Sequence, residues 1–210
     1  MDIQELYHEI NDILENDEQP SDKLEKLSSK AAFMEFPFSM LNSLKKTEQS
    51  KNYHPEGTAW VHTLMVVDEA AAIRHLSADP RVFMWGAFLH DIGKPETTAY
   101  RKGRITSYDH DRVGAELCKK FFEPFHESEE FVSQVTNLVR FHMHILYVNK
   151  ELPFSKLNEL RETGMEKEIA LIGFADRMGR GGADLATEKA EIEKFYKIAS
   201  SRNQKGKGKK

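Results

Sequence analysis

Apolar residues recur at steps of three and four along most of the chain, which is the spacing of one face of an α-helix. The first segment shows this pattern at Ile3, Leu6, Tyr7, Ile10, Ile13 and Leu14. Similar stripes predict further helices at about residues 22–31, 38–44, 58–71, 81–90, 110–123, 129–146, 154–162, 165–178 and 183–199. We therefore expect helix over most of the chain.

One stretch departs from the helical pattern. Between Thr97 and Ser107, β-branched and aromatic residues flank Lys102-Gly103, a pair that suits a tight turn. The sequence therefore predicts an all-α fold, a helical bundle with one minor β-hairpin near residues 97–107.

The predicted helix 81–90 is apolar on nearly every side, which is typical of a buried helix. Asp79 and Pro80 suit its N-cap and its first helical position. Gly93 and Pro95 follow directly and predict that the helix ends there.

The composition fits a folded domain with two appendages. Of the 210 residues, 40% are hydrophobic, which is enough to form a sizeable core. We expect an N-terminal helical extension packed on the core (1–50), a main domain (51–200) and a disordered basic tail (201–210).

The charge is unevenly distributed. The last ten residues hold five positive charges and no acid, so the rest of the chain has a formal net charge of −9. Because binding of duplex DNA depends on many lysine and arginine contacts to phosphates, this acidic body argues against duplex DNA as a partner.

The sequence also predicts where the protein acts. Its apolar runs are too short to cross a bilayer, and residues 1–20 lack the positive charge of a targeting segment. The single cysteine, Cys118, fits a reducing compartment. These features predict a cytoplasmic protein without a membrane partner.

Five titratable residues fall on core-facing stripes of five predicted helices: His62, His90, His110, His142 and Asp176. A single inward histidine is more often a hydrogen-bonded core residue than a metal ligand. Burying five such groups together would be costly, and a shared cation removes that cost. The coincidence of five therefore favours a metal site.

The neighbouring pair His90-Asp91 needs a special backbone. Adjacent residues on a helix point about 100° apart, so both reach one ion only where the helix ends or bends. Gly93 and Pro95 predict such an end.

The order of these residues, His62, then His90-Asp91, then Asp176, resembles the H…HD…D signature of the HD-domain metal-dependent phosphohydrolase superfamily. Within it, the chain is most similar to the HD domain of bacterial CCA-adding tRNA nucleotidyltransferases. The matching stretches are YHPEGTAWVHTLMVVDEAA (53–71), FLHDIGKPETT (88–98), GRITSYDHDRVGAEL (103–117), LVRFHMHI (138–145) and FADRMGRGG (174–182).

The resemblance implies that residues 51–200 form a helical HD phosphohydrolase domain that holds one or two divalent metal ions. The implied metal ligands are His62, His90, Asp91 and Asp176, while His110 and His142 match histidines that bind a second metal or the phosphate. Imidazoles and carboxylates suit Mn, Fe, Co, Ni, Zn or Mg.

Further residues are candidates for catalysis and substrate binding. Asp91 could orient the attacking water, and His110 could transfer a proton, clamp the phosphate or complete a two-metal site. Lys94 could contact a phosphate oxygen, although a solvated lysine is an equal alternative. Arg180 is a candidate phosphate contact, and His54 resembles a residue near the substrate.

The expected activity is hydrolysis of a phosphomonoester or phosphodiester of a nucleotide or an RNA end. Candidate reactions are those of a 2′,3′-cyclic phosphodiesterase, a 2′-nucleotidase or a phosphatase. A non-catalytic nucleotide-binding sensor and a di-iron oxygenase are the alternatives. Because residues 1–50 are too few for a nucleotidyltransferase domain, we do not expect CCA addition.

The remaining polar candidates are interpreted as structural. His144 lies two positions from His142, hence on the other helix face. Asp68 follows His62 on the same helix, and a capping or solvated role is preferred for it over support of an imidazole. Arg177 suits a helix C-terminus.

Overall fold

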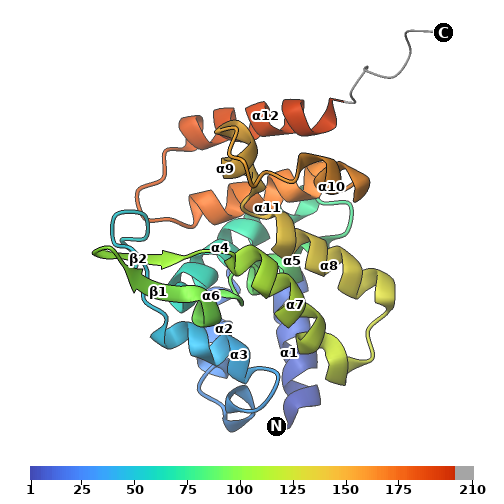
Figure 1. The fold of residues 1–210 in the computed structure, drawn as a ribbon. Coiled ribbons are helices and arrows are strands. Elements are labelled where there is room, and N and C mark those ends of the chain that lie inside the picture. The colour runs from blue at the N-terminus through green and yellow to red at the C-terminus, as the bar shows by residue number, and fades with distance from the viewer. Residues whose placement is uncertain (202–210) are drawn as a thin grey trace, which may run out of the picture.

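The computed structural model describes residues 1–201, which form a bundle of helices with one projecting two-stranded hairpin (Figure 1). This confirms the predicted all-α class. The elements are α1 (Ile3–Asn16), α2 (Ser21–Leu27), α3 (Ser39–Ser43), α4 (Ala59–Ile73), α5 (Pro80–Leu89), α6 (Lys94–Thr97), β1 (Thr98–Arg101), β2 (Arg104–Ser107), α7 (His110–Phe122), α8 (Glu129–Phe141), α9 (His144–Asn149), α10 (Leu157–Glu162), α11 (Glu166–Met178) and α12 (Leu185–Ser200).

Helix α5 lies at the centre of the bundle and packs against α1, α4, α8 and α11. Every residue from Val82 to Leu89 is buried, as the sequence predicts. The Asp79 carboxylate accepts a hydrogen bond from the Val82 backbone N–H, and Pro80 occupies the first turn. The most apolar helix is thus enclosed by the others.

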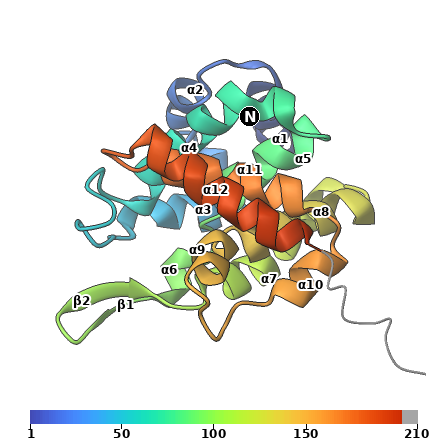
Figure 2. The ribbon, with the colours of Figure 1, turned by 90° about the horizontal axis from the view of Figure 1, so that it is seen from above.

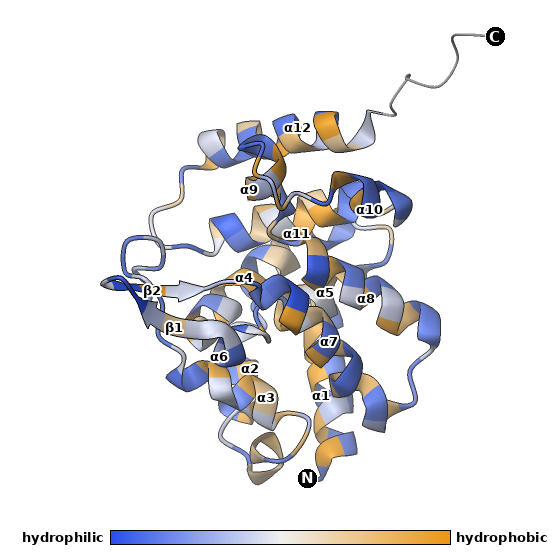
Figure 3. Cartoon of the chain, viewed as in Figure 1, coloured by the Kyte–Doolittle hydropathy of each residue, from blue (hydrophilic) through white to orange (hydrophobic). Residues whose placement is uncertain are grey.

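The N-terminal helices cover one end of α5. The ring of Tyr7 on α1 stacks on Trp85 of α5 and on Phe125, with centroid distances of 4.9 and 4.1 Å. The Asp68 carboxylate on α4 accepts a hydrogen bond from the Ser21 backbone N–H at the start of α2, which ties these two helices together. Figure 3 shows apolar and polar blocks alternating along α1 and α8, as expected of helices with one buried face.

Three predicted helices are shorter in the structure, and the one expected at 154–162 begins only at Leu157. The helix expected at 22–31 ends at Leu27, and residues 31–34 form a 3₁₀ turn. The helix expected at 129–146 ends at Phe141, and α9 begins at His144. The break allows α9 to turn toward α11, where Gly173 leaves room for the Ile145 side chain: a Cβ at position 173 would lie 1.7 Å from Ile145 Cδ1.

The predicted hairpin is present. Strands β1 and β2 are antiparallel, and Thr98 pairs with Ser107 while Arg101 pairs with Arg104. Lys102 and Gly103 have φ angles of +48° and +77°, which suit the tight turns that join twisted strands. Figure 2 shows the hairpin extending away from the helices beside α6.

Of the predicted basic tail, 201–210, all but Ser201 lies outside the described residues. Among residues 1–201, no helix combines the length and the apolar character that crossing a membrane requires.

Candidate metal centre

The six residues that the sequence singles out meet in the interior, although they come from distant parts of the chain. His62 belongs to α4, His110 begins α7, and Asp176 lies near the end of α11. No member of the group is more than 6% exposed. The group consists of His62, His90, Asp91, His110, His142 and Asp176.

Short distances join these side chains. His62 Nε2 lies 3.0 Å from Asp176 Oδ1 and 3.9 Å from Asp91 Oδ2. His90 Nε2 lies 3.3 Å from Asp91 Oδ2, and His110 Nε2 lies 3.6 Å from Asp91 Oδ1. Asp91 is therefore at the centre of the cluster.

The pair His90-Asp91 lies where α5 ends, as the sequence predicts. His90 caps α5, and the next backbone bonds run from Ile92 N–H to the Leu89 carbonyl and from Lys94 N–H to the Asp91 carbonyl. This turn lets both side chains face the same interior space. Gly93 is required here, because a Cβ would lie 2.2 Å from the backbone oxygen of His110.

Three histidines share one hydrogen-bonding arrangement. Each Nδ1 lies 2.7 Å from the backbone carbonyl oxygen three residues earlier, so it carries the hydrogen and donates it. In neutral imidazole the other nitrogen, Nε2, then has a free lone pair. The donor–acceptor pairs are His90 with Ala87, His110 with Ser107, and His142 with Val139.

These lone pairs converge inside the protein. His110 Nε2 and His142 Nε2 are 3.1 Å apart, and two lone pairs at this distance repel unless a proton or a cation lies between them. His90 Nε2 is buried and makes no hydrogen bond within residues 1–201, and Asp91 Oδ2, which is also buried, is paired with Lys94 at 2.6 Å. Unpaired buried acceptors are costly, so the arrangement fits a bound cation.

The donor set also fits a divalent metal. The ligand atoms of His62, His90 and Asp91 lie within 4.8 Å of one another, and so do those of Asp91, His110 and His142. Asp91 belongs to both groups, which could hold two ions that share its carboxylate. Imidazole nitrogens combined with carboxylate oxygens suit first-row divalent metals and Mg²⁺.

Glu56, which the sequence analysis missed, supports His62 from outside the cluster. Its Oε1 lies 2.8 Å from His54 Nδ1 and 2.9 Å from His62 Nδ1, and its side chain is only 4% exposed. Engaging Nδ1 directs His62 Nε2 toward Asp91 and Asp176. Carboxylates that orient metal-binding imidazoles in this way are common. The HPEG block, residues 54–57, is the sequence feature that could have identified Glu56.

Two cations border the cluster. Lys94 Nζ lies 2.6 Å from Asp91 Oδ2 and also donates to the Gln49 side chain, a partner that sequence reasoning did not identify. Lys94 is buried, so the solvated alternative is wrong. Arg180 donates to Asp176 Oδ2 at 2.8 Å. Both cations predicted to contact phosphate, Lys94 and Arg180, thus pair with cluster carboxylates.

The electrostatics keep the two aspartates ionised. Burial alone would raise the pKa of Asp91, but the charges of His90 and Lys94 outweigh it and hold that pKa well below its usual range. Burial likewise acts against ionisation of Asp176, and the Arg180 charge and the His62 hydrogen bond lower its pKa well below normal.

The histidines divide into two kinds. Burial, assisted by the His142 charge, lowers the pKa of His110 to about 3, and burial also lowers the pKa of His142. Both are therefore neutral at neutral pH, as metal ligands must be. Burial lowers the pKa of His62 too, but the contacts with Asp176 and Glu56 outweigh it and raise that pKa. Because Asp176 is ionised, the 3.0 Å contact is a hydrogen bond that His62 Nε2 donates to Asp176 Oδ1.

The other candidates lie outside the cluster. His54 borders it through Glu56, and burial together with the Lys94 charge lowers its pKa to about 4. His144 is buried against the rings of Phe141 and Tyr147. Arg177 pairs with Glu188 at 2.6 Å.

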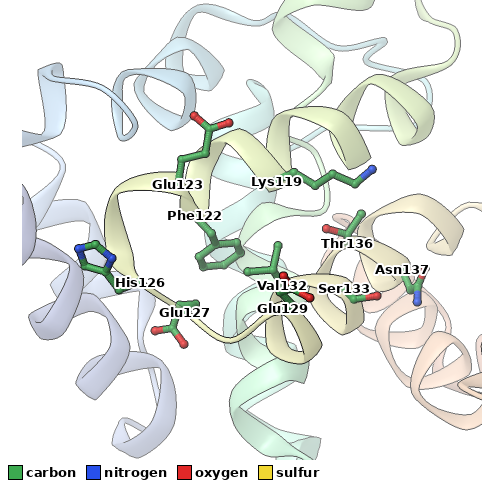
Figure 4. Close-up of a pocket in the computed structure, with 10 residues that line it drawn as sticks. All are labelled: Lys119, Phe122, Glu123, His126, Glu127, Glu129, Val132, Ser133, Thr136 and Asn137. Atoms are coloured by element: carbon green, nitrogen blue, oxygen red, sulfur yellow. The ribbon is translucent and has the colours of Figure 1, made fainter.

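A surface groove of about 500 Å³ lies between the end of α7 and the start of α8 (Figure 4). Phe122 and Val132 supply its apolar lining, and Lys119, Glu123 and Glu129 supply polar lining. None of its lining residues belongs to the cluster, so the groove does not contain the candidate chemistry.

Comparison with known proteins agrees with this geometry. The model of the HD domain family matches residues 53–181, more than half of the chain. Multifunctional CCA proteins are also similar: that of Halorhodospira halophila is 29% identical over 150 residues (69% of this chain, 35% of the relative), and that of Methylococcus capsulatus is 31% identical over 157 residues (69% and 34%).

The chain thus spans about a third of the length of these curated relatives. The matched region includes all six cluster residues together with His54, Glu56, Lys94 and Arg180. The chain therefore belongs to the HD domain family.

Proposed function

We propose that the protein is a metal-dependent phosphohydrolase. The observation that supports this most strongly is the convergence of imidazole lone pairs on the Asp91 carboxylate in a buried site. In this proposal the metal ligands are His62, His90, Asp91 and Asp176, and a second ion or the substrate phosphate is bound by His110 and His142.

A bound divalent ion supplies a Lewis acid for the phosphoryl group and lowers the pKa of coordinated water toward ~7. The protein's own residues complete the chemistry. Asp91 is held ionised and accepts hydrogen bonds from the attacking water. His110 Nε2 has a free lone pair at neutral pH, and because burial holds its pKa at about 3 it suits a second ion or a hydrogen bond from the substrate better than proton transfer.

Two cations, Lys94 and Arg180, lie at this site in an otherwise acidic protein. Lys94 and Arg180 already pair with Asp91 and Asp176, and either cation can exchange part of that contact for a phosphate oxygen. This favours an anionic substrate over a neutral one, and it favours hydrolysis of phosphate esters over oxygenase chemistry.

The substrate we propose is a phosphomonoester or phosphodiester of a nucleotide or an RNA end. The support is the similarity to part of the multifunctional CCA proteins. Cleavage of 2′,3′-cyclic phosphates, 2′-nucleotides or general phosphomonoesters is the expected range of activity.

The test is hydrolysis of 4-nitrophenyl phosphate and bis(4-nitrophenyl) phosphate with Mn²⁺, Ni²⁺, Co²⁺ or Mg²⁺. Turnover should disappear with EDTA, return with added metal, and be absent in Asp91→Ala. Glu116→Gln, an exposed change on α7, is the matched control and should retain full activity. Turnover that survives EDTA or Asp91→Ala would refute the proposal, whereas nucleotide binding without turnover would identify a sensor.

A further inference from the structure

The β-hairpin leads directly into the candidate metal centre. Strand β2 ends at Ser107, and His110 begins α7 only three residues later. The Nδ1–H of His110 donates to the Ser107 carbonyl at 2.7 Å, which ties the end of the strand to a cluster residue. The rest of the hairpin projects beyond the helices (Figure 2).

The hairpin is a basic segment in an acidic protein. Between Glu96 and Asp109 there is no acidic residue, while Arg101, Lys102 and Arg104 are all exposed. Within residues 1–201, none of these three cations forms an ion pair with a carboxylate. Their charges are therefore available to an anionic partner.

One face of the hairpin combines these charges with an aromatic ring. Side chains alternate along a strand, so Arg104 and Thr106 of β2 point to the same side. Arg101 pairs with Arg104 in the register, and its guanidinium donates to Thr106 Oγ1 at 2.8 Å. The same guanidinium lies 5.4 Å from the centroid of the Tyr108 ring. We call this surface, formed by Arg101, Arg104, Thr106 and Tyr108, the basic hairpin face.

The Tyr108 side chain is 67% exposed although it is large and partly apolar. Its Cα lies at most about 7 Å from that of His110, because only two peptide units separate them. An aromatic ring stacked with arginine at the margin of a phosphate site has the features that bind unpaired bases: a π-face for the base and cations for the backbone.

We propose that the basic hairpin face binds single-stranded nucleic acid. A base stacks on Tyr108, and Arg101 and Arg104 contact backbone phosphates. The proposal extends the proposed function, because the strand would present its terminal phosphate to the metal centre. A duplex fits less well, since its bases are already stacked and the surrounding body is acidic.

Binding can be measured without turnover. The full chain is titrated, in EDTA, into fluorescein-labelled hexauridylate RNA and hexathymidylate DNA, with fluorescence anisotropy as the readout. Tyr108→Ala should weaken binding roughly fivefold to a hundredfold, the loss expected for one stacked base. Tyr108→Phe should retain the affinity, because the stacking ring remains.

Tyr100→Ala is the matched control. Tyr100 is 76% exposed and pairs with Ile105, which places it on the opposite face of the same hairpin. Its loss should leave binding unchanged. The double variant Arg101→Ala/Arg104→Ala should reduce the slope of log affinity against log salt concentration by about 1.4, from two lost phosphate contacts to a single strand.

Dependence on Tyr108 with either oligonucleotide supports the proposal, and the tighter of the two identifies the preferred strand. Equal affinity of wild type and Tyr108→Ala, or equal losses in Tyr108→Ala and Tyr100→Ala, would overturn it. Hydrolysis of 4-nitrophenyl phosphate by the wild type tests the proposed function separately. If hydrolysis fails while binding still depends on Tyr108, the hydrolase proposal falls and the nucleic-acid surface stands.

Discussion

Replacing Glu56 is expected to weaken metal binding even though this residue is outside the proposed ligand set. Its carboxylate lies 2.8 Å from His54 Nδ1 and 2.9 Å from His62 Nδ1. The hydrogen bond from His62 lowers the pKa of Glu56 to about 2 despite the opposing effect of burial, so the carboxylate is charged at neutral pH. Without it, the ring of His62 keeps its contact with Asp176 through Nε2 but loses the contact that holds Nδ1.

The size of the effect follows from what each substitution removes. Glu56→Gln keeps an oxygen acceptor but loses the charge, whereas Glu56→Ala loses both. Changes in such supporting groups typically lower metal affinity about 10- to 100-fold. We therefore expect about tenfold for Glu56→Gln and nearer a hundredfold for Glu56→Ala, or about 1.4 and 2.7 kcal/mol.

Proton competition gives the prediction a second signature. Glu56 helps to raise the pKa of His62, and the wild type must release that proton to bind metal. The variants lack this contribution, so their deficit should be largest at about pH 8.5 and smaller near pH 6.5, close to the ordinary pKa of histidine.

The assay is titration calorimetry of the metal-free protein with Mn²⁺ or Ni²⁺ at both pH values. Glu116→Ala, in an exposed pair with Lys119, is the control and should bind as the wild type does. Wild-type affinity in Glu56→Ala at pH 8.5 would refute the supporting role of Glu56.

Three further predictions concern stability. Burial and the Arg140 charge lower the pKa of His144 to about 3. At pH 5 His144 is therefore neutral in the folded protein but protonated in the unfolded chain, which should lower the free energy of unfolding by about 2 kcal/mol. In urea denaturation, His144→Leu should therefore lose about 2 kcal/mol less than the wild type in free energy of unfolding between pH 7.5 and pH 5. The same pH dependence in variant and wild type would contradict this prediction. Gly93→Ala should lower the free energy of unfolding by about 3 kcal/mol or more, because its Cβ would meet backbone atoms of His110 and Gly114; a wild-type urea midpoint would disprove this steric reasoning. EDTA should lower the Tm of the metal-loaded wild type but not of Asp91→Ala in calorimetry, and equal shifts would argue against metal at Asp91.

Much of the cluster could be predicted from the sequence because helical spacing decides which residues share a face. His62, His90 and Asp176 each continue an apolar row, and their burial follows from that position. The proline and glycine after His90-Asp91 likewise predict the turn that brings both side chains to one place.

What could not be predicted depends on contacts between distant segments. The apolar pattern continues without a break from 129 to 146, and the close approach of α9 to Gly173 ends the helix instead. Glu56 and Gln49 lie in a loop, where no periodicity indicates direction. Lys94 follows a turn, and the sequence there is compatible with either a solvated or a buried side chain. Its burial depends on the contact with Asp91, which the sequence does not reveal.

The most direct test of the metal centre is elemental analysis of the purified protein. We predict one or two divalent ions per chain in the wild type after incubation with metal and removal of the excess. Asp91→Ala should lose them, and Glu116→Gln should keep them. A wild-type protein that retains no metal, or an Asp91→Ala variant with the wild-type metal content, would contradict the account.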